Sequence, residues 1–172
     1  MFGEARQLAS RHPFPEFEAI PDLRDGEVIV GLPTEYAIDA SARALVRRSV
    51  DVSGQPQIIV VSHPSCHFSR AAMGDIQGDP TLSAVFRAHA KWLAPQSNWI
   101  NFDTLQQWNH DHPDQPIGLT VASEDWAMID SWGTPTFYFF KEGRVHAKVE
   151  GWPRSGRRAE LLAALRVVGL LQ

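Results

Sequence analysis

The most distinctive hydrophobic pattern lies at residues 57–62, which include the unbroken apolar run Ile58 to Val61 and follow the breaking sequence Gly54-Gln55-Pro56. Its length and its β-branched content are typical of a strand that is buried on both faces, because a half-buried strand alternates apolar and polar residues. We therefore expect a central parallel strand here.

The residues before this run predict three further elements. Residues 1–25 carry several prolines among polar residues, so we expect an extended N-terminal arm. The apolar triplet within residues 27–31 predicts a short strand. Thr34 is a favourable helix N-cap, and the apolar residues after it recur at helical spacing, which predicts a helix over residues 34–50.

The residues after the run predict a second set of helices and strands. A helical pattern begins at Phe68 and resumes over residues 81–93 after an interruption at Asp79-Pro80, so either one kinked helix or two short helices fit. The other predicted elements are a weak strand at 98–102, a helix from an Asp103 cap to 110, a strand at 117–121, a helical turn at 124–132, a hairpin of strands at 137–140 and 144–150, and an amphipathic C-terminal helix marked by Leu161, Leu165 and Val168. This order predicts a mixed sheet with helices on both faces.

Composition limits the class of protein. A chain of 172 residues can bury a core of its own, and we expect residues 26–172 to form a single domain. A net charge of −4 gives no bias toward nucleic acid, so we expect no nucleic-acid partner. No segment approaches the roughly 18 apolar residues that a membrane span needs. We expect a soluble, cytoplasmic protein for the sequence as given, or a periplasmic one if Met1 replaces a removed signal sequence.

The only cysteine, Cys66, lies in the segment His63-Pro64-Ser65-Cys66-His67-Phe68-Ser69-Arg70, directly after the apolar run. One cysteine excludes an intrachain disulfide framework. A cysteine at the start of a helix faces free backbone amides and the positive end of the helix dipole, which lower the pKa of the thiol. His67, and His63 if it folds back, would favour the thiolate further when protonated. The position therefore predicts a nucleophile at neutral pH.

Two segments of the chain resemble the thioredoxin superfamily. The apolar run followed by SCHFSRAAM resembles the thioredoxin active-site turn. The more specific segment is WGTPTFYFFKEGRVHAKVEGW, in which Thr134-Pro135 resembles the cis-proline loop. The spacings from Pro135 to Gly143 and from Gly143 to Gly151, eight residues each, match the thioredoxin pattern. The resemblance implies a thioredoxin-like α/β fold with a central mixed β-sheet flanked by helices, and residues 103–121 resemble the insertion of TlpA-type relatives.

The sequence departs from the thioredoxin pattern at several positions. Ser69 replaces the resolving cysteine, so the motif is Cys-X-X-Ser; Ser65 stands where thioredoxins carry tryptophan, and Val60 where they bury an aspartate. The resemblance implies a catalytic set of Cys66, Ser69 and Pro135 and a substrate-binding set of Thr134, Trp132, His67 and Phe68. Without a second cysteine in this chain, an external thiol must release any mixed disulfide that Cys66 forms.

Three functions are consistent with these residues. The preferred one is thiol-disulfide exchange by a monothiol enzyme, with protein disulfides or glutathione as partners and no cofactor. The second is a non-catalytic binding module that keeps the fold. The third is a copper or zinc carrier in which Cys66 binds the metal with nearby histidines, drawn from His63, His67, His110 and His112. Because the sequence has no second cysteine and no strong metal-site spacing, we expect no metal site.

Overall fold

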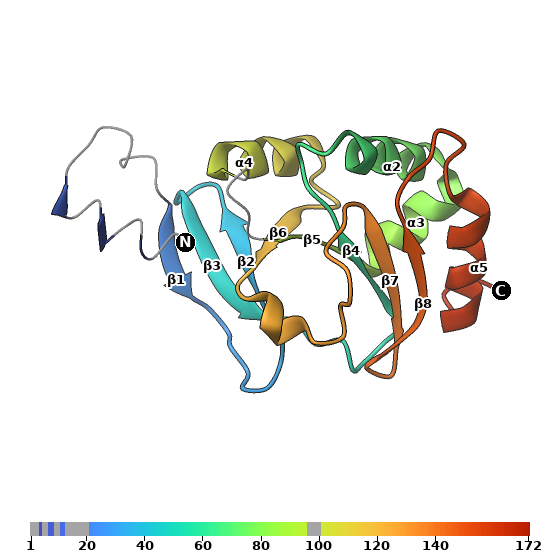
Figure 1. The fold of residues 1–172 in the computed structure, drawn as a ribbon, viewed down its shortest axis with the longest axis horizontal. Coiled ribbons are helices and arrows are strands. Elements are labelled where there is room, and N and C mark those ends of the chain that lie inside the picture. Colours follow the sequence, from blue (N-terminus) through green and yellow to red (C-terminus); the bar gives the residue numbers. More distant parts are fainter. Residues whose placement is uncertain (1–3, 5–6, 9–10, 13–20, 96–100) are drawn as a thin grey trace.

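The computed structural model describes residues 4, 7–8, 11–12, 21–95 and 101–172, and its strands form one eight-stranded mixed sheet (Figure 1). The strands are β1 (Asp22–Asp25), β2 (Thr34–Asp39), β3 (Ala44–Ser49), β4 (Gln57–Val61), β5 (Ala90–Ala94), β6 (Ile117–Thr120), β7 (Thr136–Lys141) and β8 (Arg144–Glu150). The helices are α2 (His67–Gly78), α3 (Pro80–His89), α4 (Phe102–Asp111), the 3-10 helix η2 (Ser123–Trp126) and α5 (Arg158–Val168). Across the sheet, the strand order is β1-β3-β2-β6-β5-β4-β7-β8.

One face of this sheet is covered by α2, α3, α4 and α5. Helices α2 and α3 connect β4 to the parallel strand β5, and α4 connects β5 to the parallel strand β6. Because such crossovers are right-handed and both move in the same direction across the sheet, they place their helices on the same face. Helix α5 joins them in the main hydrophobic core, which contains Ile58, Phe86, Trp92 and Leu161.

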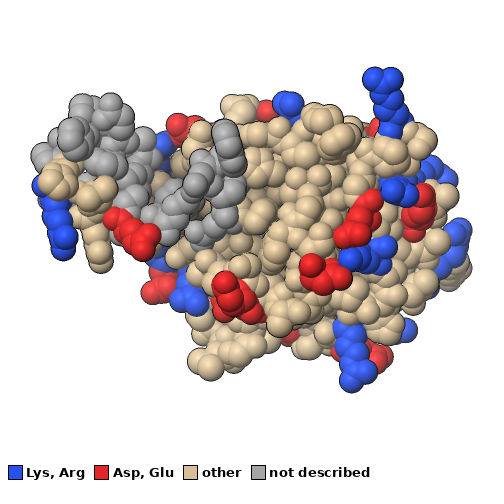
Figure 2. All heavy atoms as spheres, viewed as in Figure 1, with Lys and Arg blue, Asp and Glu red and all other residues tan. Residues whose placement is uncertain are grey.

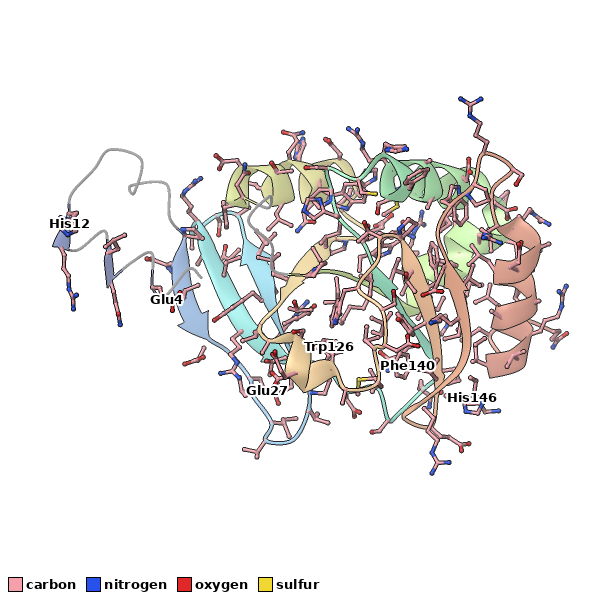
Figure 3. The ribbon with its side chains drawn as sticks, in the orientation of Figure 1. Glu4, His12, Glu27, Trp126, Phe140 and His146 are labelled. Atoms are coloured by element: carbon pink, nitrogen blue, oxygen red, sulfur yellow. The ribbon has the colours of Figure 1, made fainter. Side chains whose placement is uncertain are left out.

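The opposite face of the sheet is covered by η2 and the loop that follows it. Trp126 and Ile129 from this segment pack with Ile59, Tyr138 and Phe140 in a second core cluster. Figure 3 labels Trp126 and Phe140 of this cluster. The indole N–H of Trp126 also donates to the Thr34 carbonyl at 3.2 Å. The predicted central mixed sheet flanked by helices is therefore confirmed, with the α-helices on one face and a single 3-10 helix on the other.

Several local predictions are confirmed. Strand β4 is the apolar run, and its four residues from Ile58 to Val61 are fully buried; it is parallel to β5 but antiparallel to β7. Strands β7 and β8 form the predicted hairpin with Gly143 in its turn, and α5 is the predicted C-terminal helix.

The predicted helix over residues 34–50 is wrong, because these residues form the antiparallel hairpin β2–β3. Glu35 lies opposite Arg48 in this hairpin, and its carboxylate accepts from Arg48 Nε at 2.8 Å and from Lys91 Nζ at 2.7 Å. These contacts satisfy a carboxylate that is only 1% exposed. The turn at residues 40–43 divides the apolar residues of the predicted helix between two strands.

The predicted strand at residues 27–31 is also wrong, because this segment is an exposed loop in which Val30 is 98% exposed. Most of the predicted arm at residues 1–25 lies outside the described residues. Its last four residues, Asp22–Asp25, are strand β1, which pairs in parallel with β3. The paired backbone of β3, rather than local apolar content, therefore determines where this edge strand forms.

The helical pattern after Cys66 divides into α2 and α3 at Asp79, whose carboxylate accepts from the amides of Thr81 and Leu82. Helix α3 ends at His89, earlier than predicted, because residues 90–94 are the buried strand β5. The predicted strand at 98–102 falls mostly outside the described residues, and Phe102 begins α4, whose N-cap is Asn101 rather than Asp103. The correspondence of α4 and β6 with a TlpA-type insertion stays a prediction.

The surface carries charges of both signs. On the face shown in Figure 2, acidic and basic side chains are interspersed around a largely uncharged centre. This face therefore presents no broad field of one sign that would attract a polyanion. No helix among the described residues is long and apolar enough to cross a membrane.

Candidate functional site

Strand β4 and helix α2 together position the cysteine. The Ser62 amide continues the β4–β5 pairing by donating to the Leu93 carbonyl at 2.7 Å. A short turn follows, in which the Cys66 amide donates to the His63 carbonyl at 3.0 Å. Cys66 is then the N-cap of α2, with extended backbone angles. The thiol is half-buried at the positive end of the helix dipole, where backbone amides lack partners within the helix.

The loop before β7 lies directly opposite the cysteine. The Thr134–Pro135 peptide bond is cis. The Cys66 thiol donates a hydrogen bond to the Thr134 carbonyl, with 3.5 Å between sulfur and oxygen. The structure therefore brings together Cys66 and Thr134-Pro135, which are 68 residues apart in the sequence.

The environment of the sulfur lowers the pKa of Cys66. Burial alone would raise the pKa, because it disfavours the charged thiolate. The Thr134 side chain, the amide and hydroxyl of Ser69, and the Phe68 amide stabilise the thiolate and together outweigh burial, so the net shift in pKa is downward. The local geometry of α2 thus favours a thiolate at lower pH than for an ordinary cysteine.

Ser69 occupies the third position after the cysteine and points into the protein. It is fully buried, and its hydroxyl oxygen accepts from the His63 amide at 3.3 Å. Its side chain is also one of the groups that lower the pKa of Cys66. Ser69 is therefore not a surface helix residue; it stabilises both the turn and the sulfur.

The two histidines beside the cysteine differ in their surroundings. His63 is partly buried, and this burial lowers its pKa, so the neutral imidazole prevails at neutral pH. Its Nδ1 accepts from the Ser65 amide at 3.1 Å. Burial thus disfavours the imidazolium form through which His63 would favour the thiolate. His67 is exposed, and its ring contacts that of Phe68 at 3.8 Å between centroids.

The remaining substrate-binding candidates lie on either side of the site. Phe68 is 45% exposed on the first turn of α2, so an apolar ring faces solvent next to the cysteine. Trp132 is half-buried and packs against the second core cluster, two residues before Thr134. Their contact with a substrate stays a prediction.

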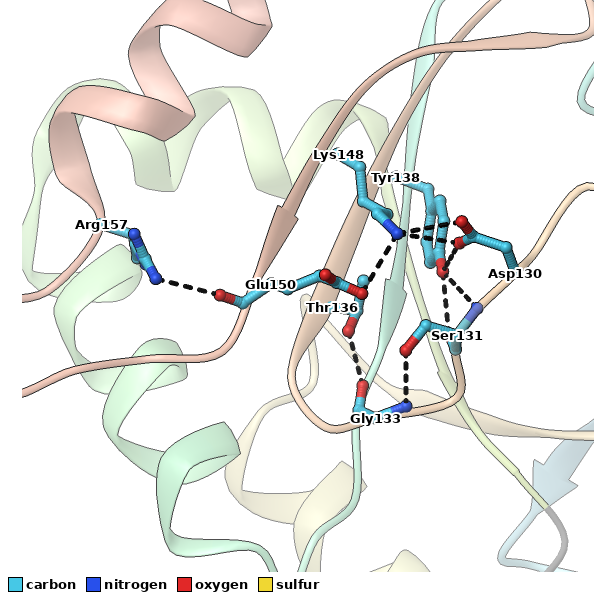
Figure 4. A network of polar contacts seen from close by, with 8 residues as sticks. All are labelled: Asp130, Ser131, Gly133, Thr136, Tyr138, Lys148, Glu150 and Arg157. Atoms are coloured by element: carbon cyan, nitrogen blue, oxygen red, sulfur yellow. Dashed lines mark hydrogen bonds and ion pairs between the residues drawn. The ribbon is translucent and has the colours of Figure 1, made fainter.

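A polar network that the sequence did not predict holds the segment leading to Thr134 (Figure 4). The Tyr138 hydroxyl, on β7, donates to the Asp130 carboxylate at 2.7 Å and accepts from the Ser131 amide at 2.8 Å. Lys148 on β8 bonds both oxygens of Asp130, at 3.1 and 3.0 Å, and pairs with Glu150 at 3.2 Å. Burial, and then the Asp130 carboxylate, raise the pKa of Tyr138, so its hydroxyl stays protonated as a donor.

Two further bonds complete the restraint of this loop. Thr136 donates from its hydroxyl to the Gly133 carbonyl at 2.7 Å, and the Gly151 amide donates to the Pro135 carbonyl at 2.8 Å. The backbone is thus bonded on both sides of Thr134, which fixes the carbonyl that faces the sulfur. No motif indicates these partners, because the pairing of β7 with β8 brings them together.

The described residues form no cluster of three or more His, Cys, Asp or Glu side chains that could hold a metal ion. His112 bonds the Gln77 side chain through Nδ1 at 3.0 Å, and His110 is exposed at the end of α4. The arrangement therefore gives no support to a copper or zinc carrier.

No protein-family profile and no curated protein matches the sequence. Several solved structures are similar in fold. A thiol:disulfide interchange protein of the thioredoxin family from Chlorobium tepidum has a TM-score of 0.54 at 15% identity, covering 80% of this chain and 95% of that one. An uncharacterized thioredoxin-like protein from Porphyromonas gingivalis has a TM-score of 0.53 at 13% identity, covering 83% and 94%. A thioredoxin-like protein from Bacteroides caccae has a TM-score of 0.53 at 15% identity, covering 96% and 61%. Together with the placement of Cys66 opposite a cis-proline, these similarities identify the fold of this chain as thioredoxin-like.

Proposed function

We propose that this protein exchanges thiols and disulfides through a single nucleophile, Cys66. The observation that carries the proposal is the position of the sulfur, at the N-terminus of α2 and within hydrogen-bond distance of the Thr134 carbonyl, with a lowered pKa. The similarity in fold to a solved thiol:disulfide interchange protein is consistent with this chemistry.

The reaction needs two displacements. In the first, the Cys66 thiolate attacks one sulfur of a substrate disulfide; a new S–S bond joins Cys66 to the substrate, and the other substrate sulfur leaves as a thiolate. In the second, an external thiolate attacks this mixed disulfide. Attack on the substrate sulfur releases Cys66 as a thiolate, whereas attack on the Cys66 sulfur releases the substrate as a thiolate and leaves Cys66 joined to the external thiol. Ser69 cannot perform the second displacement, so the external thiol comes from a protein cysteine or from a small thiol such as glutathione.

The substrate would lie between α2 and the cis-proline loop. Phe68 and Trp132 would provide apolar contacts there, and the backbone of Thr134 would pair with an extended substrate segment. Protein disulfides are therefore the substrates we propose.

The test is formation of a mixed disulfide. The protein is incubated with a peptide disulfide at neutral pH, trapped with acid and measured by mass spectrometry, with Cys66→Ser as the blank. We expect an adduct of one peptide per chain that glutathione removes and that Cys66→Ser does not form. If the wild-type thiol reacts no faster than a free cysteine, the enzyme proposal fails and a non-catalytic binding module becomes the better account.

A further inference from the structure

A cavity of about 550 Å³ opens beside the cysteine turn, between this turn and α4. Pro64 and Ser65, which directly precede Cys66, form part of one wall. Trp108 and His112 form part of the wall on the α4 side. A volume of this size is typical of sites that bind small molecules, and it begins one residue from the candidate nucleophile.

Charged groups of opposite sign face this cavity from different helices. Arg70 lines it from α2, one turn after Cys66, and its guanidinium makes no hydrogen bond or ion pair among the described residues. Asp111 lines it from the end of α4, where its exposed carboxylate accepts a single bond from Gln107 at 2.9 Å. The cavity thus offers an unpaired cation and a carboxylate with acceptor capacity to spare.

The wall between these charges is uncharged. Burial lowers the pKa of His112, so its imidazole is neutral at neutral pH, and its ring contacts Trp108 at 4.6 Å between centroids. Trp108 is only 5% exposed, and its indole N–H has no hydrogen-bond partner among the described residues. The wall therefore offers a ligand an uncharged surface between Arg70 and Asp111.

These observations match a small peptide thiol that carries both carboxylate and ammonium groups. We propose that the cavity binds the external thiol of the exchange reaction, of the class of glutathione, with Arg70 binding a carboxylate and Asp111 the ammonium group. The inference rests on the proposed function, because it concerns the thiol that Cys66 requires. The charges select glutathione over a neutral thiol, which has nothing to bind to either group.

The chemistry can be followed on a mixed disulfide between Cys66 and a chromogenic aromatic thiol. The glutathione thiolate attacks the Cys66 sulfur, a new disulfide joins Cys66 to glutathione, and the aromatic thiolate leaves with the electron pair and absorbs light. The release rate is measured over a range of glutathione concentrations, and again with 2-mercaptoethanol, which has no carboxylate or ammonium group.

The proposal predicts that the rate saturates with glutathione but stays linear with 2-mercaptoethanol. In Arg70→Gln, the half-saturating glutathione concentration should rise about two- to fivefold, the loss expected for one exposed ion pair, with no change toward 2-mercaptoethanol. Arg166→Gln, an exposed arginine on α5, is the matched control and should behave as wild type. As a readout without chemistry, unreactive S-methylglutathione should shift the Trp108 indole N–H resonance in the NMR spectrum of the reduced protein.

These measurements distinguish a failure of the proposed thiol site from a failure of the proposed exchange function. A linear dependence on glutathione, or an equal effect of Arg70→Gln on both thiols, would overturn the cavity as the thiol site while leaving exchange at Cys66 intact. If neither thiol releases the aromatic group, the proposed exchange function itself fails.

Discussion

Replacing Tyr138 with phenylalanine tests whether the polar network on β7 and β8 holds the loop that faces the cysteine. The side chain is 1% exposed, so phenylalanine fills the same space and only the hydroxyl is lost. The Ser131 amide, which donates to this hydroxyl at 2.8 Å, then has no acceptor, and Asp130 keeps only its bonds to Lys148.

The size of the effect follows from the unpaired amide. Leaving a partly buried backbone N–H without an acceptor costs about 1–3 kcal/mol, so we expect the free energy of unfolding to fall by about 2 kcal/mol. The loop from Asp130 to Thr134 loses its attachment to β7, so reactions that need the Thr134 backbone should suffer most. We expect the rate with an extended peptide disulfide to fall about three- to tenfold, while the rate with small iodoacetamide stays nearly constant.

The assays are urea unfolding and the two rates, measured at neutral pH. Tyr36→Phe is the matched control, because the Tyr36 hydroxyl lies on β2 and makes no hydrogen bond among the described residues. An unchanged peptide rate in Tyr138→Phe would refute the positioning role. An equal fall in both rates would also refute it, since this would indicate a general loss of structure rather than a displaced loop.

Three further predictions concern other parts of the molecule. Ser69→Cys should place a second thiol beside Cys66, and the oxidised variant should lose both free thiols in an intramolecular disulfide; two free thiols after oxidation would show that the two side chains do not meet. Gly118→Ala should lower the free energy of unfolding by about 1–3 kcal/mol, because the added Cβ would lie 2.6 Å from Glu35 Oε2; an unchanged urea midpoint would contradict the close approach. Burial lowers the pKa of His63 in the folded protein, so His63 binds a proton more readily in the unfolded chain than in the folded one. The free energy of unfolding of the wild type should therefore fall as pH drops through the ordinary histidine pKa, near 6.5. His63→Asn should lose less stability over this pH range in urea unfolding, and an equal loss would contradict the assignment.

The elements that could be predicted from the sequence are those with a strong local signal. The apolar run correctly predicted β4, and the two aromatic and β-branched stretches around Gly143 correctly predicted the hairpin β7–β8. The hairpin β2–β3 could not be predicted, because part of what stabilises it is the bond from Lys91 to Glu35, 56 residues away in the sequence.

In the candidate site, too, local sequence patterns could be predicted and contacts between distant segments could not. The order of a buried strand, Cys66 and a distant Thr134-Pro135 was visible in the sequence, and the structure places the sulfur against the Thr134 carbonyl. The bonds from Tyr138 and Lys148 to Asp130 were not visible, because they depend on the register between β7 and β8. The charge state of His63 could not be predicted, because it depends on burial, which the local sequence does not determine.

The central claim is that the site favours the thiolate of Cys66, and its most direct test is the pKa of this thiol. It is measured from the ultraviolet absorbance of the thiolate as a function of pH, with Cys66→Ser subtracted as the blank. We expect a pKa clearly below the ordinary cysteine value of about 8.5, because the groups of Thr134, Ser69 and Phe68 outweigh the burial of the sulfur. A pKa at or above that value would contradict it.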